Sequence, residues 1–140
     1  AQDGPARIIS LSSSFFKRNF QLGQAGNLYD VRLRTTETTD NGRPSLTTAL
    51  GSATANLTHI AYTREASGMA RAYIDGVSVV GKVIGGDCSN WYADYPLVLA
   101  NELIGDRSWL GQYHLVALFD RALSQAEITQ NYQAGHRITT

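Results

Sequence analysis

The stretch LTHIAYTREASGMARAYIDGVSVVGKV, residues 57–83, decides the fold because it contains three strand-like runs separated by two turns. The first turn falls in EASG, residues 65–68, and the second is the pair Asp75 and Gly76. Asp-Gly is favoured in the type I′ turn of a two-residue β-hairpin, where both central residues need a positive φ. We therefore expect this segment to form an antiparallel meander.

Upstream, the segment YDVRLRT, residues 29–35, alternates between two kinds of side chain. Tyr29, Val31 and Leu33 fall on one face, while the charged residues between them fall on the other. This alternation predicts a strand with one face in the core. The flanking elements that the pattern predicts are a hairpin turn at glycines 23 and 26 and a short strand over residues 45–50.

Two later runs, YPLVLANEL at 95–103 and YHLVALFDRAL at 113–123, are apolar at both alternate and adjacent positions. Strands inside a two-layer sandwich show this pattern, because they are covered on both sides. Together with the earlier runs they predict an all-β sandwich of two sheets. We expect residues 1–140 to form a single domain, since a chain of this length buries about two thirds of its unfolded surface.

The last stretch, SQAEITQNYQAG at residues 124–135, breaks the strand pattern and predicts one short C-terminal helix. Ser124 and Glu127 have the spacing of a capping box, in which each side chain bonds the other residue's backbone amide. Gly135 stands where a left-handed residue commonly ends a helix. Ile128 and the tyrosine four residues later give the helix one apolar stripe to lay against the sandwich.

The composition argues against two classes of partner. Twelve Lys and Arg balance twelve Asp and Glu, so the chain lacks the basic excess that binding of nucleic acid through its phosphates requires. No apolar run approaches the length of about 18 residues that a membrane span needs, which predicts no membrane insertion. The single cysteine, Cys88, can form no disulfide within the chain, so the fold must rest on its core.

The segment LTHIAYTREASGMARAYIDGVSV, residues 57–79, resembles the hairpin of laminin-G-like, concanavalin A-like sandwich domains, in which a His-x-Ala-x-Thr strand precedes a Tyr-x-Asp-Gly turn. Residues 118–135, LFDRALSQAEITQNYQAG, resemble the closing strand and helix of these domains. Residues 26–38 and 99–124 are similar to the bacterial variant. The resemblance implies a jelly-roll of two antiparallel sheets with one short C-terminal helix, used as a binding or adhesion module of a large secreted or surface protein.

The motifs of an enzyme active site are missing from the sequence. Glycosidases on this sandwich carry acidic residues at alternate positions of one strand, because a retaining mechanism needs two carboxyl groups about 5 to 5.5 Å apart. No two acidic residues here stand two positions apart, and the closest pairs are Glu37 with Asp40 and Glu102 with Asp106. We therefore predict that the domain is not an enzyme, and a polysaccharide hydrolase or lyase is the least favoured interpretation.

The stretch NELIGDRSWLG, residues 101–111, combines an indole ring with amide, carboxylate and guanidinium groups directly after a predicted strand. A sugar site needs these parts, since an aromatic face stacks on the C–H side of a pyranose and planar polar groups bridge its hydroxyls. A second aromatic group lies in SNWYADY, residues 89–95. The predicted ligand-binding residues are Trp91, Tyr92, Asn101, Glu102, Asp106, Arg107, Trp109, Arg32 and Arg34.

The same residues also have a purely structural interpretation. Glu102 follows alternate apolar residues of a predicted strand, so its carboxylate starts inside or at the edge of the core, where an unpaired charge is costly. Arg107 is the nearest cation in sequence, and Arg32 or Arg34 from a neighbouring strand is the alternative partner. In this interpretation Trp109 plugs the end of the core. We expect the loop to be structural first and a ligand contact second.

Arg32 and Arg34 share one strand face, which suits a carboxylated polysaccharide or another anion, although solvated charge is the simpler interpretation. The loops ETTDNG and GGDCSNWYAD offer oxygen ligands of the kind that calcium prefers, but neither has the regular spacing of an EF-hand. The sequence thus leaves open a structural calcium ion, with Asp40, Asp87 and Asp94 among its ligands, or no cofactor at all.

We predict a non-catalytic binding module of an extracellular bacterial protein, with a polysaccharide or another glycan as its ligand. The alternative is a structural or protein-interaction module that serves adhesion or docks other domains of a larger protein. The two differ in the state of the tryptophans. A structural module predicts that Trp91 and Trp109 are both fully buried and that an apolar patch is exposed elsewhere.

Overall fold

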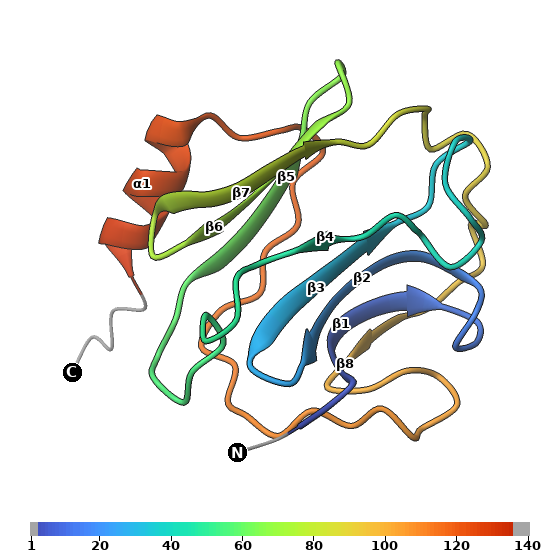
Figure 1. Ribbon diagram of the computed structural model, residues 1–140, viewed down its shortest axis with the longest axis horizontal. Coiled ribbons are helices and arrows are strands. Elements are labelled where there is room, and N and C mark those ends of the chain that lie inside the picture. The colour runs from blue at the N-terminus through green and yellow to red at the C-terminus, as the bar shows by residue number, and fades with distance from the viewer. Residues whose placement is uncertain (1–2, 136–140) are drawn as a thin grey trace.

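The fold is a sandwich of two antiparallel sheets with one short helix, as Figure 1 shows. The computed structural model describes residues 3–135. One sheet has five strands in the order β4-β3-β2-β1-β8, and the other has three in the order β5-β6-β7. The elements are β1 (Ala6–Ser12), β2 (Arg18–Ala25), β3 (Leu28–Leu33), β4 (Leu46–Thr47), β5 (Ile60–Arg64), β6 (Met69–Ile74), β7 (Val77–Val83), β8 (Leu97–Leu99) and α1 (Gln125–Ala134). The predicted fold class is therefore confirmed.

The three-stranded sheet is the meander that residues 57–83 predict. Asp75 and Gly76 have φ values of 51° and 81°, as a type I′ turn requires. At the first turn, the amide of Glu65 donates to the carbonyl of Met69 at 2.9 Å, and the amide of Gly68 donates to the carbonyl of Glu65 at 2.9 Å. Both predicted turns are confirmed.

The hairpin between β2 and β3 turns at Gly26 and Asn27. Gly26 has a φ of 58°, which glycine adopts at little cost because it lacks a Cβ. The prediction that Gly23 also belongs to the turn is wrong, because Gly23 lies inside β2. A Cβ at that position would stand 2.7 Å from the carbonyl oxygen of Ala6, so glycine here permits the close approach of β1.

The core lies between the two sheets and follows the predicted alternation. Tyr29, Val31 and Leu33 are buried on one face of β3. Val31 belongs to the same buried cluster as Ala70 and Ala72 of the facing sheet. The facing sheet also packs larger, partly buried residues against this cluster: Ile60, Tyr62, Ile74 and Val80.

Two of the predicted strands differ in the structure. The strand expected over 95–103 is reduced to β8, because Ala100, with a φ of 62°, turns the chain out of the sheet. The strand predicted over 113–123 is wrong, since the structure has no strand there. Figure 1 shows this segment as an orange coil that leads from the β8 side of the sandwich to α1. An apolar pattern predicts an extended chain. It does not show whether that chain runs beside a strand whose backbone groups are free to pair with it.

The capping box predicts α1 correctly. The hydroxyl of Ser124 accepts from the amide of Glu127 at 3.2 Å, and the Glu127 carboxylate accepts from the amide of Ser124 at 2.8 Å. Gly135 ends the helix with a φ of 59°. Ile128 is buried against Tyr73, so α1 covers the outer face of the three-stranded sheet. No helix within residues 3–135 is long and apolar enough to cross a membrane.

Substitution of Ser124 by alanine tests the cap. The variant S124A loses the side-chain acceptor for the Glu127 amide, and we expect it to be less stable by about 1 kcal/mol. Thermal denaturation followed by circular dichroism should give a melting temperature lower by about 3 to 6 °C. The matched control is Gln130→Ala on the exposed side of the same helix, which should leave the melting temperature nearly unchanged. Equal losses in both variants would contradict the capping role.

Candidate functional site

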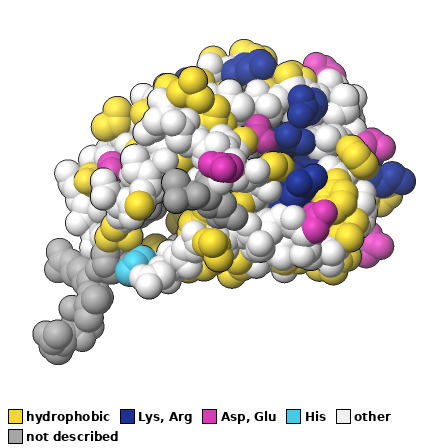
Figure 2. Space-filling model, turned by 60° about the horizontal axis from the view of Figure 1, so that its bottom comes forward, with side chains coloured by type: hydrophobic (Ala, Val, Ile, Leu, Met, Phe, Trp, Pro, Cys, Tyr) yellow, Lys and Arg dark blue, Asp and Glu magenta, His cyan; other side chains and the backbone are white. Residues whose placement is uncertain are grey.

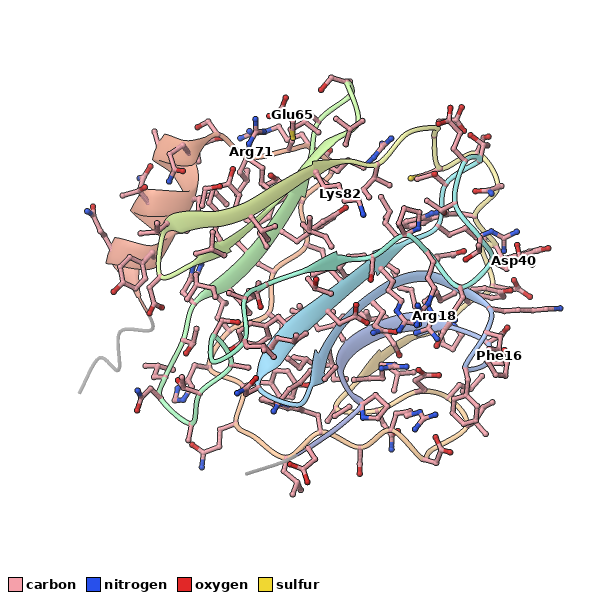
Figure 3. All side chains as sticks on the ribbon, in the orientation of Figure 1. Phe16, Arg18, Asp40, Glu65, Arg71 and Lys82 are labelled. Atoms are coloured by element: carbon pink, nitrogen blue, oxygen red, sulfur yellow. The ribbon has the colours of Figure 1, made fainter. Side chains whose placement is uncertain are left out.

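The outer face of the five-stranded sheet carries a buried network of polar side chains. The alternation that points Tyr29 and Val31 into the core points the charged residues of β3 the other way. Arg18, at the start of β2, is fully buried in this network and is labelled in Figure 3. We call the following set the polar face: Arg7, Arg18, Gln21, Asp30, Arg32, Asn41 and Glu102.

Glu102 reaches the polar face from the loop that follows β8. Its Oε1 accepts a hydrogen bond from Nε of Arg7 and lies 3.4 Å from Nη1 of Arg18. The loop is tied to β1 because the amide of Arg7 donates to the carbonyl of Arg107 at 2.9 Å. The carboxylate is fully buried. Both contacts are to Oε1 and replace the water that this atom loses, whereas Oε2 is buried with no hydrogen-bond partner among residues 3–135.

The structure confirms that Glu102 is buried and paired, but the predicted partners are wrong. The guanidinium of Arg107 lies 4.9 Å over the ring of Phe15, and Arg32 binds a different carboxylate. The true partner, Arg7, stands 95 residues away in sequence. Because β1 pairs with β8, the turn at the end of β8 brings Glu102 directly over β1.

Five polar residues form a closed ring beside Glu102. Asn41 Oδ1 accepts from Nε of Arg18 at 2.7 Å and from Nη1 of Arg32 at 2.9 Å. Asp30 Oδ2 accepts from Nε of Arg32 at 2.9 Å and from Nε2 of Gln21 at 3.3 Å. Gln21 closes the ring by accepting from Arg18. Each side chain is thus held by two others, which makes this face of the sheet rigid.

Burial also perturbs the two innermost cations. It lowers the pKa of Arg7 and brings the pKa of Arg18 down to about 10, while the negative charge of Glu102 acts in the opposite direction. Guanidinium groups keep their proton at neutral pH. The polar face therefore holds three cations, Arg7, Arg18 and Arg32, against the two carboxylates of Asp30 and Glu102.

A second group of predicted residues meets at the end of β3, where the loop after β3 runs beside the loop after β7. Trp91 Nε1 donates to the carbonyl of Arg34 at 2.7 Å, and the Tyr92 ring lies 4.8 Å from the Arg34 guanidinium carbon. Arg34 Nη2 lies 3.1 Å from Oδ1 of Asp40. We call Arg34, Asp40, Trp91 and Tyr92 the rim site.

The rim site keeps its aromatic surface in contact with solvent. Trp91 is 37% exposed and Tyr92 is 49% exposed, whereas Arg34 is buried beneath them. The side chain of Asn19 fixes the backbone of Tyr92, since it donates to the carbonyl at 2.7 Å and accepts from the amide at 3.1 Å. The structure thus joins three of the predicted ligand-binding residues, Arg34, Trp91 and Tyr92.

The residues predicted in the 101–111 loop do not join the rim site. Asn101 organises the loop, because its Oδ1 accepts from the amides of Glu102 at 2.8 Å and Arg107 at 2.9 Å. Trp109 packs against the core, as the structural interpretation predicts, with its ring 5.1 Å from that of Tyr113. Asp106 is exposed beside Arg107. This loop is therefore mainly structural.

The aspartates predicted as calcium ligands are engaged elsewhere or stand apart. Asp40 faces Arg34. Asp87 accepts from the amide of Ser89 at 2.9 Å, and hydrogen bonding by the side chain and then the amide of Ser89 lowers the pKa of that exposed carboxyl. In the part of the chain that the structure describes, no three His, Cys, Asp or Glu side chains, Asp94 included, gather as a metal site. The residues present do not fit a carboxylate-rich calcium centre.

A laminin-G family model, described as the concanavalin A-like lectin/glucanases superfamily, matches residues 1–129. The chain belongs to this superfamily. Comparison with curated proteins gives no match. Among solved structures, it is similar to residues 221–444 of an S-layer domain-containing protein from Clostridium thermocellum, with 18% identity and a TM-score of 0.41. That match covers 93% of this chain and spans 64% of the other.

For this member of the concanavalin A-like lectin/glucanases superfamily, sequence reasoning missed most of the polar face. Five of its seven residues were not among the predicted ligand-binding residues: Arg7, Arg18, Gln21, Asp30 and Asn41. The available signal was the alternation of β2, in which Gln21 stands between two apolar residues and so points away from the core. The high share of arginine, ten of the twelve cations, was a second signal, since arginine is the cation best suited to buried pairing.

The variant Glu102→Gln tests the structural role of this carboxylate. It leaves Arg7 and Arg18 without their counter-charge, so we expect a loss of about 1 to 3 kcal/mol and a melting temperature lower by several degrees. The matched control is Asp106→Asn, an exposed carboxylate of the same loop. An E102Q variant that keeps its full thermal stability but loses glycan binding would show that the loop is a ligand contact first and a structural element second.

Proposed function

We propose that this domain is a non-catalytic module that binds carbohydrate and is carried by an extracellular or cell-surface bacterial protein. The observation that carries the proposal is the rim site, which places two partly exposed aromatic rings beside a guanidinium and a carboxylate. Aromatic faces stack on the apolar side of sugar rings, and planar polar groups bridge sugar hydroxyls.

The rim site is also preorganised for binding. The bond from Trp91 Nε1 to the carbonyl of Arg34 holds the indole in one orientation while part of its surface remains in solvent. The backbone of Tyr92 is held by Asn19. Because these residues are already ordered, binding costs less conformational entropy than it would on a mobile loop.

The state of the carboxylates supports a binding role over a catalytic one. Glu102 and Asp30 are both buried, and each is already occupied by arginine. A general acid must give its proton to a substrate that contacts it, and a nucleophilic carboxylate must reach the anomeric carbon. Both side chains are covered by the surrounding protein, so neither carboxylate is open to a substrate at the surface.

One observation favours the alternative, a protein-interaction or adhesion module. Val77, Val79 and Val83 are exposed along β7, which lies at an edge of the three-stranded sheet. An exposed apolar stripe on an edge strand suits contact with another protein domain. The partly exposed state of Trp91 and Trp109 does not match the fully buried tryptophans that this alternative predicts.

Glycan-array screening and affinity electrophoresis against neutral and acidic polysaccharides test the proposal. We expect the domain to bind at least one polymer, and Trp91→Ala or Tyr92→Ala to weaken that binding by about tenfold, the effect of losing about 1.4 kcal/mol. The matched control is Tyr132→Ala, which removes a similarly exposed tyrosine from α1. An absence of binding to every polymer would move the domain to the interaction class, whereas equal binding by all the variants would show that the rim site is not the binding site.

A further inference from the structure

We propose that the rim site selects acidic glycans, with Arg34 receiving the carboxylate of a uronic acid residue in place of Asp40. The inference rests on the proposed function and adds the ligand class. In the bound state the sugar carboxylate pairs with the guanidinium, and the sugar ring contacts Trp91 and Tyr92. Four observations carry this assignment.

First, the guanidinium of Arg34 has unused donors. Its side chain is 9% exposed, and its Nε and Nη1 atoms are buried without a hydrogen-bond partner. An arginine carries five N–H donors in a planar fork, and buried donors are nearly always paired in proteins. Here only Nη2 reaches a carboxylate, at 3.1 Å from Asp40. A planar ligand carboxylate that takes the place of Asp40 at Nη2 can also accept from either Nε or Nη1, so it supplies an acceptor that Asp40 does not.

Second, a ligand can displace the Asp40 carboxylate from Arg34. Its side chain is 61% exposed, in contrast to the arginine that it contacts. The turn that carries it is fixed independently, because the carbonyl of Asp40 accepts from the amide of Arg18 at 3.0 Å. The Asp40 side chain can therefore move into water without unfolding the turn. Exchange of one carboxylate for another also leaves the charge balance around Arg34 unchanged.

Third, the aromatic cover of Arg34 has one fixed and one movable part. Trp91 is held by its bond to the Arg34 carbonyl, as described above. The backbone of Tyr92 is held by Asn19, and its ring lies 4.9 Å from the ring of Tyr95, but no hydrogen bond to its hydroxyl occurs among residues 3–135. Rotation of this half-exposed ring uncovers the edge of the guanidinium while the ring stays beside it. The ligand then meets a cation and two aromatic faces together.

Fourth, cations lie on the side of the molecule that carries the rim site, although the chain as a whole is neutral. Figure 2 shows Lys and Arg side chains on the right-hand side of the face that it brings forward, with Asp and Glu side chains among them, and the loops after β3 and β7 lie on the right in Figure 1. The neighbouring polar face adds one cation in excess of its carboxylates. Such a field attracts a polyanion and weakens as salt is added.

The test compares polygalacturonate, its methyl ester and neutral dextran by affinity electrophoresis and isothermal titration calorimetry. We expect polygalacturonate to bind at least about tenfold more tightly than the ester, because esterification removes the charge-assisted bonds to Arg34. Arg34→Lys keeps the charge but loses the planar fork, so it should lose most of this preference. Free galacturonate serves as a further arm that separates recognition of the sugar from recognition of the chain.

The variant Asp40→Asn is the sharper test, since its site is exposed and circular dichroism can verify its fold. It removes the competing carboxylate, and we expect affinity for polygalacturonate to rise several-fold with no change for dextran. The matched controls are Glu65→Gln and Arg71→Lys. They alter the exposed ion pair on the other sheet, which Figure 3 labels, and should change neither affinity.

The outcomes separate this inference from the proposed function. Equal binding of acid and ester, or no gain in Asp40→Asn, overturns the assignment to uronic acids and leaves carbohydrate binding in place. Tighter binding of dextran sulfate than of polygalacturonate, with the same response to Asp40→Asn, overturns the choice of carboxylate. Failure of every polymer to bind overturns both proposals.

Discussion

The carboxylate of Glu102, buried between Arg7 and Arg18, is the contact on which the rest of the five-stranded sheet depends. Its three members come from β1, from the start of β2 and from the loop after β8, so one contact joins three segments. Removing one partner of a buried ion pair costs more than the intact pair contributes, because the other charge is left buried without its counter-charge. Release of the loop after β8 would remove the counter-charge of Arg7 and Arg18, so this contact holds the loop on the sheet.

The polar face and the rim site are directly connected. The consecutive residues Asp40 and Asn41 belong to the rim site and the polar face respectively, since one contacts Arg34 and the other accepts from Arg18. Binding sites keep their geometry when a second layer of hydrogen bonds holds the contacting residues. The two carboxylates of the polar face, those of Asp30 and Glu102, serve as counter-charges for arginine.

The comparison of sequence and structure separates local features from distant ones. The Asp75–Gly76 turn and the α1 cap were predicted because each depends on neighbouring residues alone. The burial of Glu102 was predicted, but its side was not, because the strand ends at Leu99 and Glu102 lies in the polar face and not at the core. Its partner Arg7 was not predictable either, because their contact depends on the order of strands in the sheet. The same limit explains the rim site, whose residues were predicted singly while their meeting depends on two loops running side by side.

A double-mutant cycle between Arg7→Gln and Glu102→Gln, measured by urea denaturation, tests the central claim most directly. If the buried pair holds the sheet and its loop together, the double variant should be more stable than the sum of the single losses predicts, with a coupling energy of about 1 to 3 kcal/mol. Single losses that add to within about 0.5 kcal/mol would contradict the account, because independent sites behave in that way.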